Sequence, residues 1–144
     1  MQETPKSMLW SGRILSTIAT LFMIMDGTMK IFKPPFVIQT SAQLGYAESL
    51  LPGIGIALLF STAVYIVPRT SILGALLLTG YLGGAVASNV RSGAPLFNTL
   101  FPIIFAFFVW GGLWLRDPRL RALLPFTPDR SPNYRAVSAL APKH

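Results

Sequence analysis

Long apolar runs separated by short polar connections account for most of this chain. The runs cover residues 11–32, 50–67, 72–90 and 96–115. At about 1.5 Å of rise per helical residue, roughly 18 to 22 residues cross a hydrocarbon core about 30 Å thick. The pattern therefore predicts an all-α fold, an integral membrane four-helix bundle that occupies residues 1–126.

Two shorter segments predict helices that lie on the membrane surface. Residues 36–44, between Pro35 and Gly45, are too few and too polar to span the membrane. After the fourth span, Asp117 and Pro118 form a good helix start, with an aspartate cap followed by proline at the first helical position. They predict an amphipathic helix over residues 117–124. Residues 127–144 are polar and contain three prolines, which predicts a C-terminal tail.

Two features of the later spans predict how the helices pack. Gly80, Gly84 and Ser88 recur every four residues, and this small-residue stripe is expected to let another helix backbone approach closely. Pro102 lies inside the fourth span, where its ring should kink the helix and leave the carbonyl of Asn98 without its helical donor.

Composition narrows the possible chemistry. Only 12% of the residues are charged, 52% are hydrophobic, and the mean hydropathy is +0.56. The chain has no cysteine, and its single histidine is His144 at the end of the sequence. Thiolate chemistry and cysteine-ligated metals are therefore excluded, and a histidine site within the spans has no candidate. We predict no metal site and no catalytic residue, so an enzyme is the less favoured class.

The net charge of +7 is unevenly placed. Nine of the twelve basic residues lie before or early in the first span, in the second connection, or after the fourth span. They are Lys6, Arg13, Arg69, Arg116, Arg119, Arg121, Arg130, Arg135 and Lys143. This bias predicts cytoplasmic N- and C-termini. The basic side is expected to meet anionic membrane lipids, and nucleic acid is not a predicted partner.

Polar residues gather at the opposite, external end of the predicted bundle. Asp26 and Lys30 stand four residues apart on one helical face, in the favourable order for an ion pair. A carboxylate this deep in the membrane needs a partner, so we predict that Asp26 pairs with Lys30 or Arg91. Further polar side chains are expected at the same end, and the candidate cluster comprises Asp26, Lys30, Glu48, Asn89, Arg91 and Tyr81. Two interpretations stay open: the cluster holds the helices in register, or it binds the polar head of a quinone or lipid.

Several segments in order along the chain carry a family resemblance. They are MDGTMK (25–30), AQLGY (42–46), YIVPRT (65–70), LTGYLGGAVA (78–87) and WGGLWLRDPRLR (110–121). Over about residues 15–124 the chain resembles the DoxX-like family of small four-span bacterial membrane proteins. The resemblance implies a location in the bacterial cytoplasmic (inner) membrane.

The resemblance also implies possible functions, because the wider family includes a membrane subunit of a thiosulfate:quinone oxidoreductase. The favoured prediction is a non-catalytic accessory or interaction subunit of a membrane complex, with other membrane-protein subunits as partners. The alternative is a quinone-linked redox component or a quinone- or lipid-binding membrane protein, with quinone as its cofactor. A small transporter is a weaker third hypothesis, since the spans show no inverted repeat.

Overall fold

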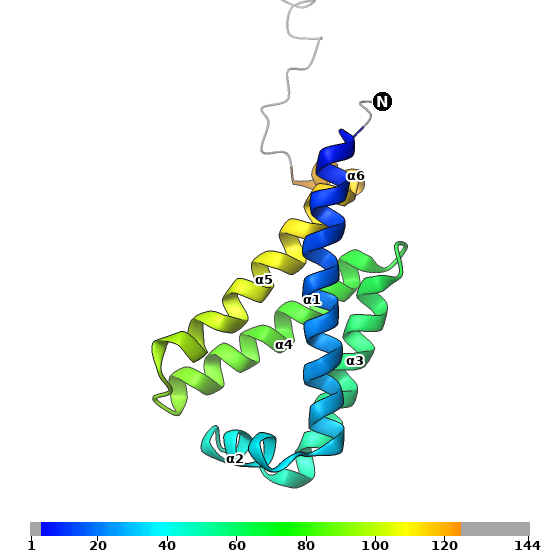
Figure 1. The fold of residues 1–144 in the computed structure, drawn as a ribbon. Coiled ribbons are helices and arrows are strands. Elements are labelled where there is room, and N and C mark those ends of the chain that lie inside the picture. The colour runs from blue at the N-terminus through cyan, green and yellow to red at the C-terminus, as the bar shows by residue number, and fades with distance from the viewer. Residues whose placement is uncertain (1–3, 125–144) are drawn as a thin grey trace, which may run out of the picture.

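The computed structural model describes residues 4–124, and within that range it contains helices and turns but no strand (Figure 1). The elements are α1 (Lys6–Phe32), α2 (Pro35–Gln43), the 3-10 helix η1 (Glu48–Leu50), α3 (Leu51–Ile66), α4 (Ser71–Arg91), α5 (Leu96–Arg116) and α6 (Pro118–Leu123). The predicted all-α class is confirmed. The predicted tail over residues 127–144 lies outside the described residues.

The four long helices are those that the hydropathy pattern predicted. α1, η1 with α3, α4 and α5 are each long and apolar enough to cross a membrane. Large apolar side chains point outward along them, and Leu21, Phe60 and Phe107 are 63%, 64% and 72% exposed. A bilayer would cover such faces. α1 begins at Lys6 rather than at residue 11, so the helix is about one turn longer at its start than the predicted span.

Both segments that were predicted to form short helices are helical. α2 follows Pro34, with Pro35 in its first turn, and it ends just before Gly45, whose backbone has a φ of +84°. Asp117 caps α6, since its carboxylate accepts a hydrogen bond of 2.9 Å from the backbone N–H of Arg119. Arg119 also donates to the carbonyl of Pro68 at 2.8 Å, which ties α6 to the turn between α3 and α4.

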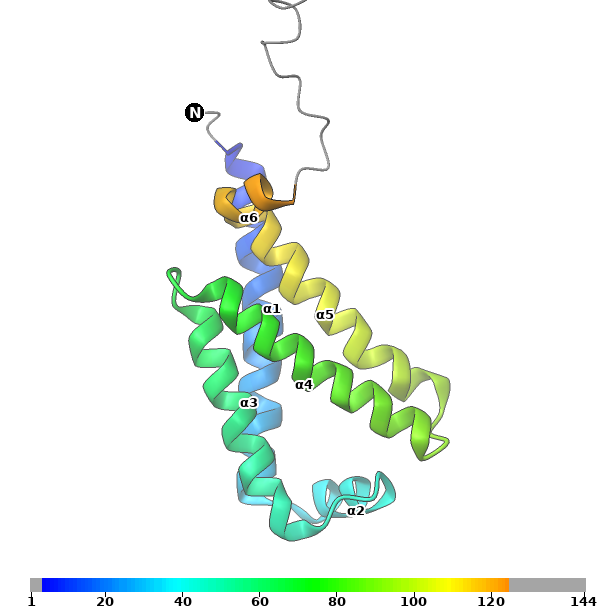
Figure 2. The ribbon, with the colours of Figure 1, turned by 180° about the vertical axis from the view of Figure 1, so that it is seen from behind.

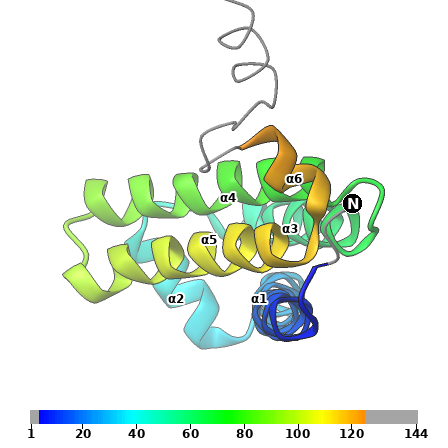
Figure 3. The ribbon, with the colours of Figure 1, turned by 90° about the horizontal axis from the view of Figure 1, so that it is seen from above.

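The long helices form two pairs that touch at one end and separate at the other. α1 packs against α3 and α5, and α4 packs against the same two helices. In Figures 1 and 2 the α4–α5 pair runs obliquely to the α1–α3 pair, and α2 lies across the opening between them. The view from above in Figure 3 shows α4 and α5 side by side, with α2 beneath them. We call the end where α1 begins and α5 ends the terminal end, and the opposite end the α2 end.

Glycines mark the points where helix backbones come closest. A Cβ on Gly55 of α3 would lie 2.6 Å from the carbonyl oxygen of Gly27 in α1, and one on Gly12 would lie 2.8 Å from the carbonyl oxygen of Gly112 in α5. A side chain on Gly74 of α4 would overlap the backbone of Tyr65 in α3. Close backbone approach of this kind replaces the hydrophobic driving force that is lacking between helices in a membrane.

The stripe of Gly80, Gly84 and Ser88 does not pack against another helix, so the sequence prediction was wrong here. A Cβ on Gly80 or Gly84 would meet no atom within 4 Å. Ser88 is buried, but its hydroxyl is hydrogen-bonded to the carbonyl of Gly84 and to Tyr46 rather than covered by a backbone. The stripe lies where α4 has moved away from α1, and all three residues line a pocket there.

A buried hydrogen-bonded tyrosine joins three helices at the terminal end. Tyr65 of α3 is 1% exposed. Its hydroxyl donates to the carbonyl of Val109 in α5 at 2.8 Å and lies 3.0 Å from the hydroxyl of Ser16 in α1. Such a polar group in the core is stable only when its hydrogen bonds are made, so it fixes how α1, α3 and α5 meet.

The glycine contacts predict opposite effects for two similar substitutions. Gly55→Ala places a methyl group against the carbonyl of Gly27 and should lower the free energy of unfolding by roughly 1 to 3 kcal/mol through overpacking. Gly83→Ala adds the same atoms to open space and should be neutral or stabilising by up to about 1 kcal/mol, because alanine favours helix. Unfolding in mild detergent measures both, and equal stability of the two variants would contradict the packing described.

Candidate functional site

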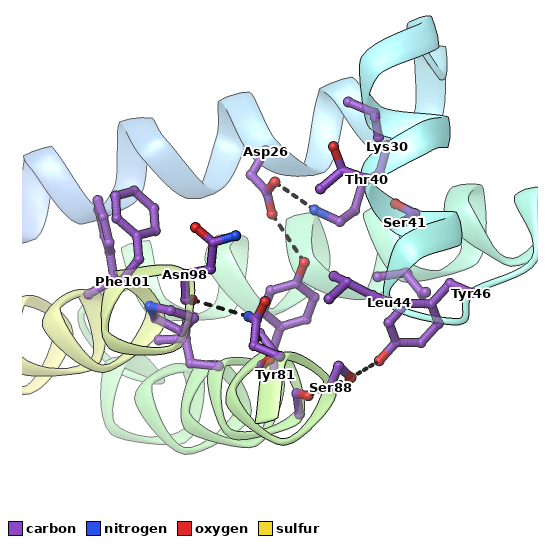
Figure 4. A pocket seen from close by; sticks show the side chains of 18 of the residues that line it. Asp26, Lys30, Thr40, Ser41, Leu44, Tyr46, Tyr81, Ser88, Asn98 and Phe101 are labelled. Atoms are coloured by element: carbon purple, nitrogen blue, oxygen red, sulfur yellow. Dashed lines mark hydrogen bonds and ion pairs between the residues drawn. The ribbon is translucent and has the colours of Figure 1, made fainter. Parts of the chain in front are cut away.

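A pocket of about 590 Å³ occupies the opening at the α2 end (Figure 4). All five of the helices α1 to α5 contribute to its lining. Its apolar part includes Phe22, Met23, Phe36, Val37, Leu51, Ile54, Phe97, Phe101 and Phe105. Its polar part includes Asp26, Lys30, Thr40, Ser41, Tyr46, Tyr81, Ser88, Asn89 and Asn98. The pocket is therefore amphipathic, as small-molecule sites in proteins commonly are.

Asp26, Lys30 and Tyr81 form the polar centre of this pocket. The ammonium of Lys30 lies 2.6 Å from one carboxylate oxygen of Asp26, and the hydroxyl of Tyr81 donates to the other at 3.1 Å. The side chains of Lys30 and Asp26 are 18% and 31% exposed, so the pair is largely shielded. Of the two partners predicted for Asp26, Lys30 and Arg91, the structure shows Lys30. The opposite charges cancel, and both carboxylate oxygens already have a donor.

Helix spacing and tertiary packing contribute separately to this centre. Asp26 and Lys30 meet because residues four apart on α1 share a face. Tyr81 comes from α4, which packs against α3 and α5 rather than closely against α1. The hydrogen bond from Tyr81 to Asp26 therefore spans the opening between the helix pairs. The ammonium of Lys30 lies 6.0 Å from the centre of the Tyr81 ring.

Phenylalanines from α1 and α5 form the apolar side of the pocket. The ring of Phe22 stacks on Phe105, with centroids 4.1 Å apart and an interplanar angle of 26°. Phe101 meets the edge of Phe22 at 5.1 Å and lies 4.9 Å from Phe105. Offset and edge-on contacts are the favourable arrangements of aromatic rings. The result is a firm apolar surface next to the polar centre.

Asn89 donates a hydrogen bond to the backbone carbonyl that Pro102 leaves without a helical donor. The side-chain amide of Asn89 donates to the carbonyl of Asn98 at 3.1 Å and to that of Ala85 at 2.9 Å. Asn98 stands four residues before Pro102, so its carbonyl has no helical donor, as the sequence predicted. α5 nevertheless continues unbroken from Leu96 to Arg116. Asn89 thus lines the pocket and also joins α4 to α5.

Glu48 and Arg91 do not join the polar centre, so the predicted single cluster was wrong in this part. Glu48 pairs with Lys33 at 3.1 Å, and their side chains are 53% and 35% exposed. Arg91 donates to the carbonyl of Leu44 at 3.2 Å. Neither residue lines the pocket. Arg91 is instead bonded just beyond the end of α2, and Glu48 is paired at the base of the connection that contains α2.

The connection that contains α2 is fastened at its base and near its end. The Lys33–Glu48 pair joins the residue after α1 to the start of η1, and thereby closes the base of the connection. Beyond α2, the hydroxyl of Tyr46 lies 2.6 Å from the hydroxyl of Ser88 in α4. Arg91, also in α4, donates to the carbonyl of Leu44 in the same connection. α2 is thereby held across the pocket, which explains why it supplies lining residues.

Sequence reasoning missed Thr40, Ser41 and Tyr46 as lining residues. The polar character of residues 36–44 indicated a surface helix, but nothing in that pattern showed that the helix returns over the bundle. Tyr46 lies within a segment that carries the family resemblance, and that was the available signal. Within residues 4–124 the structure has no group of three or more histidine, cysteine, aspartate or glutamate side chains that could hold a metal ion.

Comparison with known proteins gives one match. Residues 14–112 match the family model described as the DoxX-like family. These residues include every side chain that lines the pocket, from Phe22 to Phe105. No curated protein and no solved structure matches the chain.

The Asp26–Lys30 pair predicts non-additive effects on stability. Asp26→Asn and Lys30→Met should each lower the free energy of unfolding by roughly 1 to 3 kcal/mol, because each leaves a shielded charge without its partner. The double variant should lose less than the sum, since neither charge is left alone. Unfolding of the four proteins in detergent gives the coupling energy, and strictly additive losses would contradict the pairing.

The contribution of the Asn89 hydrogen bond to stability should depend on the presence of Pro102. Asn89→Leu leaves the carbonyl of Asn98 unpaired and should cost about 1 to 3 kcal/mol of stability. In a Pro102→Ala background the backbone N–H at position 102 can reach that carbonyl, so the same substitution should cost less. The unfolding free energies of the four variants test this, and an equal cost in both backgrounds would show that Asn89 acts elsewhere.

Proposed function

The chain belongs to the DoxX-like family of membrane proteins, and on this premise we propose that it binds a lipid-soluble amphiphile in the pocket beside α2. The observation that carries the proposal is the arrangement of the pocket. An ion pair and a tyrosine hydroxyl lie on one side, and a phenylalanine surface lies on the other. A molecule with a polar head and an apolar body matches both sides at once.

The charges of the pocket favour an uncharged head that accepts hydrogen bonds. Asp26 and Lys30 neutralise each other, and the carboxylate already has two donors. An ammonium carries three N–H groups, and Asp26 takes one of those of Lys30. Lys30 can therefore donate to a carbonyl oxygen of a ligand while it stays paired. The carbonyl groups of a quinone suit such a donor.

The size of the pocket agrees with this ligand class. A volume of about 590 Å³ falls within the roughly 300 to 1,000 Å³ of sites that hold drug-sized ligands. A quinone ring with the first part of its tail is of this size, whereas a phospholipid has two long chains and a charged head. The wider DoxX-like family includes a membrane subunit of a thiosulfate:quinone oxidoreductase, which points to the same ligand class.

The proposed role is binding without catalysis by the protein itself. None of the side chains that line the pocket in the described part of the chain is a cysteine or histidine, and the whole sequence has no cysteine. A protein of this kind can hold a quinone for another component of a membrane complex, so the predicted role as an accessory subunit is compatible with ligand binding. The family resemblance supports a location in the bacterial inner membrane, and the charge distribution supports cytoplasmic N- and C-termini.

Two neighbouring glycines of α4 offer a matched test of the proposal. Gly84 lines the pocket and Gly83 does not, yet a Cβ at either position meets no atom within 4 Å. Gly84→Leu should fill the pocket and lower the affinity for a quinone at least about tenfold, which corresponds to ~1.4 kcal/mol, without loss of stability. Gly83→Leu should bind as the unmodified protein does.

The measurement has two parts. Organic extraction of protein purified in mild detergent, followed by mass spectrometry, determines how much quinone each variant retains. Titration with a short-tailed quinone then gives the affinity. Equal binding by the Gly83→Leu and Gly84→Leu variants, or no binding by the unmodified protein, would contradict the proposal.

A further inference from the structure

A second polar group stands apart from the pocket beside α2. Arg116 is the last residue of α5, and its guanidinium lies 5.1 Å from the centre of the Tyr65 ring. Its Nε and Nη2 atoms are buried, and residues 4–124 supply no hydrogen-bond partner for either atom. Arg116 as a whole is half-buried, so two of its three guanidinium nitrogens are shielded without an acceptor. Leaving such donors unpaired is costly, and in a membrane a charged side chain of this kind usually marks a functional site.

The backbone position of Arg116 shows which way its side chain runs. A Cβ on Gly12 would lie 3.0 Å from the backbone nitrogen of Arg116, so this part of α5 lies against α1 at that level. The guanidinium shares a groove with Thr17 and Thr20, which stand further along α1. By helical rise these residues are about 7 to 12 Å from Gly12 toward the α2 end. The side chain therefore extends along the membrane-spanning part of α1.

The groove offers hydrogen-bond donors and one positive charge. It has a volume of about 200 Å³ and is lined by Thr17, Thr20, Leu21, Tyr65, Ile66 and Arg116. None of these residues is acidic. The hydroxyl of Tyr65 is already bonded to Ser16 and Val109.

The two threonines of the groove differ from other threonines of the bundle. Thr28 and Thr62 donate to the backbone carbonyl four residues earlier. Among residues 4–124 no such bond is found for the hydroxyl of Thr17 or Thr20. Both hydroxyls are therefore free to bond to a ligand beside Arg116.

The surroundings of the groove identify the kind of molecule that would enter it. Tyr65 and Ile66 end α3 and Arg116 ends α5, so the groove lies toward the terminal end. Basic residues gather at that end, including Lys6, Arg13, Arg69, Arg119 and Arg121. At the border of the groove Leu21 and Ile66 are 63% and 48% exposed, and they offer apolar surface to a hydrocarbon chain.

We propose that this groove binds the phosphate of an anionic phospholipid from the leaflet at the terminal end. A guanidinium and hydroxyl groups are suited to phosphate oxygens, and hydrogen bonds between charged partners are the strong ones. The phosphate supplies the acceptors that Arg116 lacks among the described residues, while an acyl chain of the lipid lies along Leu21 and Ile66. This site is independent of the pocket beside α2, because no residue lines both.

The test compares lipid binding by the full-length protein after removal of its native lipids in mild detergent. Phosphatidylglycerol and phosphatidylcholine with identical chains are titrated, and native mass spectrometry counts the bound lipid. The unmodified protein should prefer phosphatidylglycerol. Loss of one charged hydrogen-bonding partner is worth about 1.5 to 3 kcal/mol, so Arg116→Gln should weaken phosphatidylglycerol binding by about 10-fold or more. Arg69→Gln is the control, because Arg69 is exposed and does not line the groove.

A second variant keeps the test valid if Arg116→Gln unfolds. Thr17→Val with Thr20→Val removes only the two hydroxyls from positions that are not buried, and it should also weaken phosphatidylglycerol binding. Competition by inorganic phosphate separates the two sources of phosphate: failure to displace the lipid supports a lipid site, and full displacement at equal concentration would overturn it. Equal binding of the two lipids by the unmodified protein, or an unchanged preference in both groove variants, would also overturn the proposal.

Discussion

Close backbone contact at a few glycines is the constraint on which the rest of this structure depends. α1 touches α5 near Gly12 and Gly112 toward the terminal end, and it touches α3 near Gly27 and Gly55 toward the α2 end. Gly74 brings α4 against Tyr65, again toward the terminal end. Because lipid and helices are equally apolar, helices in a membrane associate where such close packing is available. α4 and α5 are therefore held at the terminal end and diverge from α1 toward α2.

Because the helices diverge, a pocket forms between them, and a polar group inside it needs hydrogen-bond partners from both sides. In a medium without water, a carboxylate such as Asp26 must find its partners within the protein. Lys30 supplies one from the same helix, and Tyr81 supplies the other from across the opening. The same groups that stabilise the charge leave a neutral polar surface for a ligand. The structural and the ligand-binding interpretations of these residues are thus compatible, since one arrangement serves both.

The two ends of the bundle differ in electrostatic character. At the α2 end four charges occur in pairs, Asp26 with Lys30 and Glu48 with Lys33, and Arg91 donates to the carbonyl of Leu44. Toward the terminal end, Arg116 has donors that residues 4–124 leave without an acceptor. A neutral amphiphile suits the first environment, and an anionic lipid head suits the second. The two proposed ligands therefore follow from a difference in charge balance between the ends.

The sequence by itself determined those features that depend on spacing along one helix. It located the four spans because each is one continuous apolar run. It also located the Asp117 cap, Lys30 as one of two possible partners of Asp26, and the unpaired carbonyl before Pro102, because each of these involves residues within about one turn. The tertiary structure alone decided which residue meets Asp26 from α4, what Asn89 does for α5, and that Gly80 and Gly84 face a pocket. It also separated Glu48 and Arg91 from the cluster. These outcomes depend on where distant helices cross, and glycine contacts set the crossings. The local sequence does not distinguish the glycines that make these contacts from the glycines that face open space.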